Sequence, residues 1–153
     1  DLSGKRIGVC TACAYEAYLE HTLVVPGQDI AFAIDEPTIV GYDTDTSALR
    51  DLAAGDGAEL DAVLTDPDTG RSAIEGGMRL KQLGEPLYYD FVAAAVDKNS
   101  SLDPVPLVAR LTEIIQEMHA DGTLSRLSEQ YYGADDWARN AAEFDIDALE
   151  QHP

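Results

Sequence analysis

Two short segments of this chain combine residue types and spacing that suit the binding of a small polar molecule. One is the loop that follows the apolar run at residues 7–10, and the other ends in an aspartate. Backbone N–H groups at the start of a helix attract a carboxylate, and an aspartate accepts charged hydrogen bonds from an ammonium group. The candidate ligand-binding residues are therefore Cys10, Cys13, Ala14, Tyr15 and Asp66.

Each segment also has a purely structural interpretation. The loop at residues 10–15 can be an ordinary turn between a strand and a helix. Asp66 can be a helix N-cap, because it stands before Pro67 and proline is favoured at the first helical position. A cap and a ligand role are compatible, since two carboxylate oxygens offer about four acceptor positions.

Cys10 and Cys13 are the only cysteines and form a C-x-x-C pair. A local disulfide that braces the loop, two free thiols and a thiol redox centre are the three interpretations, of which the redox centre is the least favoured. Structural zinc needs four ligands, and the three histidines show no matching spacing. We therefore expect no metal and no cofactor.

Apolar runs followed by helical spacing predict three strand-helix units in the first half of the chain. The predicted strands cover residues 7–10, 38–42 and 62–65. The run Asp-Thr-Asp-Thr-Ser at 43–47 supplies several candidate caps for the second helix, which Gly55 ends, and the third helix begins at Pro67. Alternating apolar residues at 30–34 indicate an edge strand.

Three such units predict an α/β fold, a three-layer α/β/α arrangement with a mostly parallel sheet. In open sheets of this kind, ligands bind beyond the carboxyl ends of the strands. We therefore expect the loop at 10–15 and Asp66 to converge on one hollow.

The second half of the chain changes from strands to helices. Residues 80–83 and 91–96 are apolar enough to predict further strands, and two amphipathic helices follow, ended by Gly122 and Gly133. A weak helical pattern joins Trp137, Ala141 and Phe144. The expected organisation is an α/β lobe at 1–97, a helical segment at 98–133 and an acidic tail at 134–153.

Composition limits the classes of partner. Ten basic and 29 acidic residues give a formal net charge of −19, which argues against nucleic acid and anionic membranes as partners. The longest apolar candidate, residues 91–96, is far shorter than the ~20 residues of a membrane span. The first residues resemble a turn before a strand, so we expect any export signal to have been removed or to lie upstream.

The order of the motifs resembles the extracytoplasmic solute-binding proteins of ABC importers for polar amino acids, which have the type II periplasmic-binding fold. The matching segments are DLSGKRIGV at 1–9, Tyr15-Glu16 followed by Tyr18-Leu19, YDTDTSALRDLAAG at 42–55, DAVLTD at 61–66, GEPLYYD at 84–90 and IIQEMHADGTLSRLSEQYYG at 114–133. They run in collinear order over about the first 133 residues.

This resemblance implies that the chain is the second of two lobes that close over an amino acid, followed by helices that return to the first lobe. Asp66 matches the aspartate that binds the ligand's ammonium. Ala12, Cys13 and Ala14 replace the usual Gly-Thr-Thr, so only backbone amides remain there for the carboxylate. The first lobe, with its arginine clamp, is absent from this chain.

The implied function is capture of a polar amino acid outside the cytoplasm, in the periplasm or at the cell surface, and its delivery to a membrane permease. The missing half would come from a longer parent protein or from a second copy of the chain, against which the apolar helix faces would pack. The same fold also serves sensory receptor domains and cyclohexadienyl dehydratases.

Overall fold

The computed structural model describes residues 2–25, 28–55, 57–99, 101, 103–132 and 137–142, with side chains to residue 139 in the last helix. The chain divides into two compact units, Asp1–Tyr89 and Asp90–Pro153, and each is described by itself.

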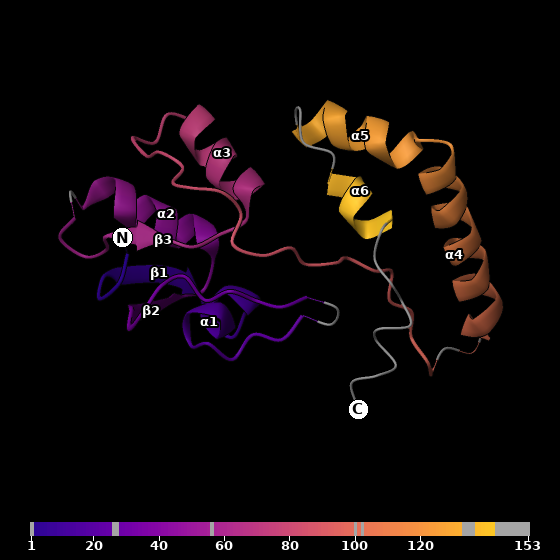
Figure 1. Ribbon diagram of the computed structural model, residues 1–153, viewed down its shortest axis with the longest axis horizontal. Coiled ribbons are helices and arrows are strands. Elements are labelled where there is room, and N and C mark those ends of the chain that lie inside the picture. The colour runs from indigo at the N-terminus through magenta and orange to yellow at the C-terminus, as the bar shows by residue number, and fades with distance from the viewer. Residues whose placement is uncertain are drawn as a thin grey trace. The chain divides into compact units, whose positions relative to one another are not determined.

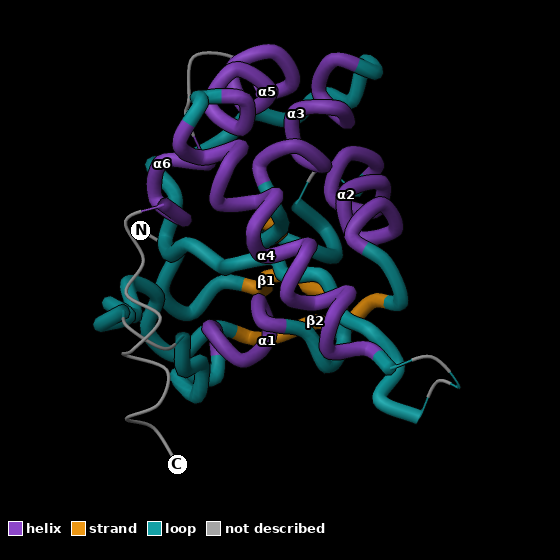
Figure 2. Tube along the Cα trace, turned by 90° about the vertical axis from the view of Figure 1, so that its right-hand side faces the viewer, coloured by secondary structure: helices purple, strands orange, loops and turns teal. Residues whose placement is uncertain are grey.

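The first unit is an α/β unit built on a three-stranded parallel sheet. Its strands are β1 (Arg6–Cys10), β2 (Thr38–Tyr42) and β3 (Ala62–Val63), in the order β2-β1-β3. Arg6 pairs with Thr38 at one end of the β1–β2 ladder, and Ile7 pairs with Ala62 on β3. The central strand is therefore the first in the sequence: Figure 1 shows β1 between β3 and β2, and Figure 2 shows β1 beside β2 from another side.

Helices cover both faces of this sheet (Figure 1). Helix α1 (Ala14–Leu19) lies on the face to which Ile7 and Val9 contribute, because these two side chains share a core cluster with Tyr18 and Leu19. Helix α2 (Asp45–Ala54) lies on the other face, where a Cβ on Gly8 would come within 3.3 Å of Ala48. Helix α3 (Pro67–Glu75) contacts α2. The predicted three-layer α/β fold is confirmed.

Local sequence signals set the ends of these helices. Thr44 caps α2 by accepting a hydrogen bond from the Ser47 amide at 3.2 Å, and Gly55 ends it. Asp66 caps α3 before Pro67, and Gly76 ends that helix. Helix α1 ends at Leu19, and Leu23 packs against the core from the following loop.

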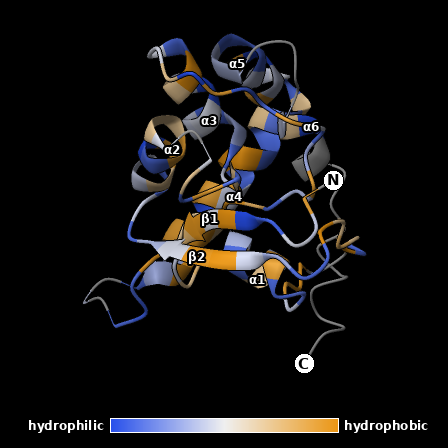
Figure 3. Cartoon of the chain, turned by 90° about the vertical axis from the view of Figure 1, so that its left-hand side faces the viewer, coloured by the Kyte–Doolittle hydropathy of each residue, from blue (hydrophilic) through white to orange (hydrophobic). Residues whose placement is uncertain are grey.

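The largest apolar cluster of the first unit lies on the α1 face, and Ala48, Leu49 and Leu60 are buried on the α2 face. Figure 3 shows the apolar colouring along β1 and β2. Tyr18 is fully buried, donates a hydrogen bond from its hydroxyl to the Ala31 carbonyl at 2.9 Å and accepts one from the Ala33 amide at 2.9 Å. The predicted edge strand at 30–34 is therefore wrong: this segment bonds to a side chain instead of a neighbouring strand.

Two other predicted strands are also wrong. Residues 80–83 and 91–96 have no regular secondary structure. A strand must pair its N–H and C=O groups with a neighbour, and the described part of the sheet ends at β3 on one side and β2 on the other. Leu83 and Val92 are exposed, so an apolar run alone did not determine a strand here.

The second unit is helical in its described residues. Helix α4 (Pro104–Ala120) begins at the N-cap Asp103, whose carboxylate accepts a hydrogen bond from the Val105 amide at 3.0 Å. It is followed by α5 (Thr123–Tyr132) and α6 (Trp137–Ala142). Gly122 follows the end of α4 and has a φ of 75°, which glycine adopts readily. The predictions for Gly133 and Phe144 lie outside the described residues.

Candidate functional site

The sheet topology brings the two candidate segments to one edge. Strands β1 and β3 are parallel neighbours, and the Leu64 amide extends their pairing by a hydrogen bond of 3.0 Å to the Gly8 carbonyl. The loop after β1 leads to α1 on one face, whereas the turn after β3 leads to α3, which packs with α2 on the other face. Such a divergence between neighbouring strands is where open parallel sheets bind ligands.

Two bonds brace the loop after β1. The Thr11 amide donates a 2.9 Å hydrogen bond to the Tyr42 carbonyl, which extends the pairing with β2. A disulfide joins Cys10 to Cys13, with their Cα atoms 5.7 Å apart. Between them Ala12 has a φ of 56°, a left-handed conformation that is costly for a residue with a Cβ. The loop is therefore held in one shape from both ends.

Backbone amides of this loop are available to an acceptor. Cys13 is the N-cap of α1, and its side chain makes no capping hydrogen bond. Within the described residues, the amides of Cys13 and Ala14 donate no hydrogen bond. The Ala12 amide does donate, at 2.5 Å, to the carboxylate of Glu16. The loop thus already binds one carboxylate, which belongs to the chain itself.

Tyr15 has a different environment from the rest of the loop. Its side chain is partly buried and packs against the core cluster around Tyr18. The phenol ring therefore helps to fix α1 on the sheet.

Asp66 is the N-cap of α3, one of the two roles predicted for it. Its Oδ1 atom accepts hydrogen bonds from the amides of Asp68 at 3.1 Å and Thr69 at 2.9 Å. Oδ2 takes no hydrogen bond from the described residues. The cap therefore occupies one carboxylate oxygen and leaves the other for a donor from outside the chain.

The negative charge at this edge affects a neighbouring acid. Partial burial and the nearby charge of Asp66 raise the pKa of Asp68 above its ordinary value, and Arg71 partly opposes that change. A cation placed beside Asp66 would relieve the same repulsion. The edge is thus electrostatically suited to a positively charged group.

One hydrogen bond at this edge, between Thr65 and Asp45, could not be predicted from any pattern in the sequence. The Thr65 hydroxyl donates a hydrogen bond of 2.9 Å to Oδ2 of Asp45, at the start of α2. The two residues are twenty positions apart and belong to different strand-helix units, so only the packing of α2 against the sheet brings them together. Spacing within a single element could not have revealed this pair.

A hollow of about 470 Å³ lies beside this edge, between α2 and α3. Its lining combines hydroxyl groups and one carboxylate with apolar side chains: Thr46, Leu49, Asp68, Thr69, Ser72, Ala73, Gly76 and Met78. None of these is a predicted ligand-binding residue. Among the residues that the structure describes, no group of three or more acidic, histidine or cysteine side chains is placed to hold a metal ion.

Comparison with known proteins shows what the chain is similar to. It is 30% identical, over 136 residues, to the L-cystine-binding protein TcyJ of Escherichia coli K12. It is 32% identical over the same length to the probable amino-acid-binding protein YxeM of Bacillus subtilis 168. Each match covers 88% of this chain but only 44% and 46% of the relatives. The chain thus spans less than half the length of the curated relatives it matches.

No family model and no solved structure matches the chain. The two relatives nevertheless confirm the resemblance to amino-acid solute-binding proteins. None of the described helices combines the length and apolar composition that crossing a membrane requires.

Proposed function

We propose that this chain is one lobe, with its following helices, of a solute-binding protein that captures a polar amino acid and delivers it to an ABC permease. The observation that supports this proposal is that two kinds of group follow neighbouring parallel strands: the amides of Cys13 and Ala14 after β1, and Oδ2 of Asp66 after β3. The names of both relatives support it.

The two groups match the two ends of an amino acid. The ligand's α-carboxylate accepts hydrogen bonds from the amides of Cys13 and Ala14, at the positive end of α1. The ligand's ammonium donates to Oδ2 of Asp66, while Oδ1 keeps its bonds to α3. The Glu16 carboxylate stays on the Ala12 amide and does not compete for these donors.

We infer a polar amino acid as the ligand class, and L-cystine is the first compound to test because one relative is named for it. Side-chain selectivity requires contacts beyond the two zwitterion contacts. The remaining wall of the site would come from a first lobe or from a second copy of the chain.

The proposed location is extracytoplasmic. The Cys10–Cys13 disulfide supports it, because disulfides persist in oxidising compartments. The same bond leaves neither cysteine as a free thiol, so in this state neither offers a thiolate nucleophile. We propose a binding protein without catalysis, in line with the names of the relatives.

Isothermal titration calorimetry of the full-length protein with L-cystine and the common amino acids tests this function. Asp66→Ala should weaken binding by ~1–3 kcal/mol, because a charged hydrogen bond to the ammonium is lost. The proposal fails if none of these compounds binds to the unaltered protein.

Asp103→Ala is the matched control. Asp103 is also an N-cap before a proline, and its carboxylate bonds to the Val105 amide at the start of α4. The substitution removes the same kind of cap but should leave affinity unchanged. Equal affinities for the Asp66 and Asp103 variants would restrict Asp66 to its capping role.

A further inference from the structure

The contact between Thr65 and Asp45 joins two loops at the edge that carries Asp66. Thr65 follows β3 and immediately precedes Asp66, and Asp45 is the first residue of α2, after β2. Strands β2 and β3 are not neighbours, because β1 lies between them. The 2.9 Å hydrogen bond therefore links the carboxyl ends of both outer strands past the central one.

Asp45 is not required as the cap of α2. Thr44 already fills that role, through its bond to the Ser47 amide. Oδ1 of Asp45 is buried and has no hydrogen-bond partner. A buried carboxylate oxygen without a partner is unfavourable. The dipole of α2 favours an acid in its first turn, but that interaction does not require the hydrogen bond to Thr65.

The chain geometry shows what the contact controls. Asp66 is held from its C-terminal side by the amides of Asp68 and Thr69, which bond to Oδ1. On its N-terminal side, Thr65 is held by Asp45. The turn is thus fixed on both sides of Asp66, and so is the direction in which its remaining oxygen can meet a donor.

We propose that Asp45 is a positioning residue for ligand binding: through the Thr65 hydroxyl it fixes the turn that presents Asp66 to the ligand's ammonium group. This inference rests on the proposed function, because it assigns Asp45 and Thr65 a role at the same site. Neither residue touches the ligand in this scheme.

The test compares affinities for L-cystine, or for the amino acid that binds best, by calorimetry on the full-length protein. Thr65→Val removes the hydroxyl donor at nearly constant shape, and Asp45→Ala removes its acceptor. Each should weaken binding about tenfold, the effect of one charge-assisted hydrogen bond. Thr65→Ser keeps the hydroxyl and should bind within about twofold of the unaltered protein.

A second comparison separates positioning from general loosening of the fold. In an Asp66→Asn background, which keeps a capping oxygen, Thr65→Val should cause no further loss of affinity, because its effect passes through Asp66. Thr38→Val, the same substitution at the opposite end of the sheet, is the control and should not change affinity. Each variant is measured at least 10 °C below its own unfolding midpoint.

The outcomes are distinguishable. If the unaltered protein binds no amino acid, the proposed function fails whatever the variants do. If it binds and Asp66→Asn weakens binding, but Thr65→Val and Asp45→Ala keep full affinity, the positioning role is overturned. The positioning role is also overturned if Thr65→Ser binds the amino acid as weakly as Thr65→Val does. A third contrary result would be that Thr65→Val still weakens binding when Asp66 has already been replaced by asparagine.

Discussion

The two compact units of this chain differ in what they bury. In the first unit, β1 lies between two helical layers, and Ile7, Val9 and Tyr18 are almost fully buried. In the second, α4 has no buried residue among those described, and large apolar side chains such as Leu107 and Tyr131 are exposed. Amphipathic sequence is common to both units, but among the residues that the structure describes, the buried apolar side chains all belong to the first.

This difference indicates how much of the fold each unit specifies by itself. A parallel sheet with helices on both faces buries apolar side chains within one unit. The apolar face of α4 needs a surface to cover it, and a contiguous face of this kind marks an interaction site. We therefore expect substitutions to be costly in the first unit and cheap in the second, as long as the second has no partner.

The largest expected effect is at Tyr18. Tyr18→Ala would remove a fully buried ring and both hydroxyl bonds to the 31–33 segment. Chemical denaturation should show a loss of ~3–5 kcal/mol in the free energy of unfolding. Tyr131→Ala is the matched control, because that ring is 70% exposed and its loss should cost about 0.5 kcal/mol or less. If Tyr18→Ala and Tyr131→Ala lowered the free energy of unfolding by similar amounts, the two units would not differ in burial as described here.

A smaller effect is expected at Gly8, on the α2 face of β1. A Cβ there would lie 2.8 Å from Leu60 Cδ1 and 3.3 Å from the Ala48 Cβ. Gly8→Ala should therefore destabilise the fold by ~1–3 kcal/mol through overpacking, measured by thermal unfolding.

Gly70, inside α3, is the control for Gly8→Ala, because the same substitution there is expected to have the opposite effect on stability. A Cβ added at Gly70 would lie 3.8 Å from Thr65 Cγ2, which is an ordinary van der Waals contact. Gly70→Ala should stabilise the protein by ~0.5–1 kcal/mol, because alanine is the better helix former. A stabilising Gly8→Ala would show that the α2 layer is loosely packed.

A still smaller effect is expected at Leu107 on α4. This side chain is 53% exposed, so Leu107→Ala should change the free energy of unfolding of this chain by no more than about 0.5 kcal/mol. Leu49→Ala, on the buried face of α2, should cost ~2–5 kcal/mol. A large loss at Leu107 would mean that its helix face is covered in solution, and light scattering would show whether a second copy covers it.

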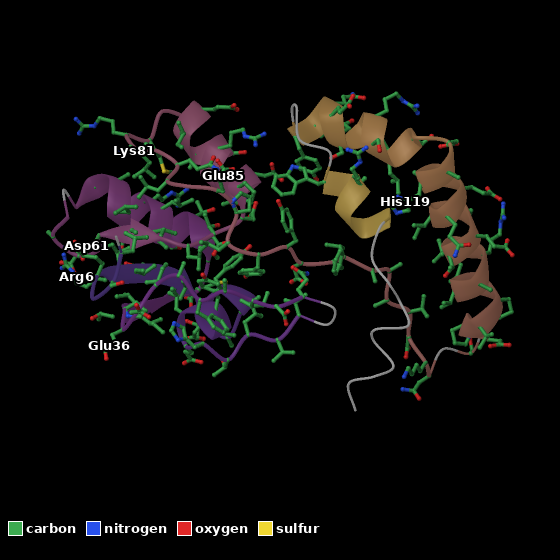
Figure 4. All side chains as sticks on the ribbon, viewed as in Figure 1. Arg6, Glu36, Asp61, Lys81, Glu85 and His119 are labelled. Atoms are coloured by element: carbon green, nitrogen blue, oxygen red, sulfur yellow. A yellow bond between two sulfur atoms is a disulfide. The ribbon has the colours of Figure 1, made fainter. Side chains whose placement is uncertain are left out.

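The smallest effect concerns the ion pair between Arg6 and Asp61 (Figure 4). The hydrogen bond from the Arg6 side chain lowers the pKa of Asp61. The pair therefore stabilises the fold at pH values above the ordinary carboxyl pKa of about 3.9, and this stabilisation is lost as the pH falls through the lowered value in the folded state.

Thermal unfolding midpoints between pH 7 and pH 2 would measure that dependence. In the Asp61→Asn variant, the unfolding midpoint should fall slightly less steeply as the pH is lowered. The change should be small because the ion pair is exposed and surface ion pairs contribute little to stability. If the midpoint of this variant depends on acid pH as it does in the unaltered protein, other carboxyl groups cause the pH dependence.

Much of the first unit could be predicted because its signals are local. The structure confirms the strands at 7–10 and 38–42, a helix cap within residues 43–47 and the helix start at Asp66-Pro67, all of which depend on neighbouring residues. The strands predicted at 80–83 and 91–96 failed because a strand depends on a neighbour elsewhere in the chain. Periodicity carries no information about that neighbour.

For the candidate site, the sequence by itself determined the chemical groups: an acid at the start of a helix, small residues with accessible amides, and two cysteines three positions apart. Only the tertiary structure decided that β1 is the central strand, that the two loops therefore share one edge, and that Thr65 meets Asp45. The physical reason is how far apart in the sequence the interacting residues lie. Caps and turns depend on bonds to neighbours in the chain, whereas strand order and the Thr65–Asp45 bond depend on packing that joins distant segments.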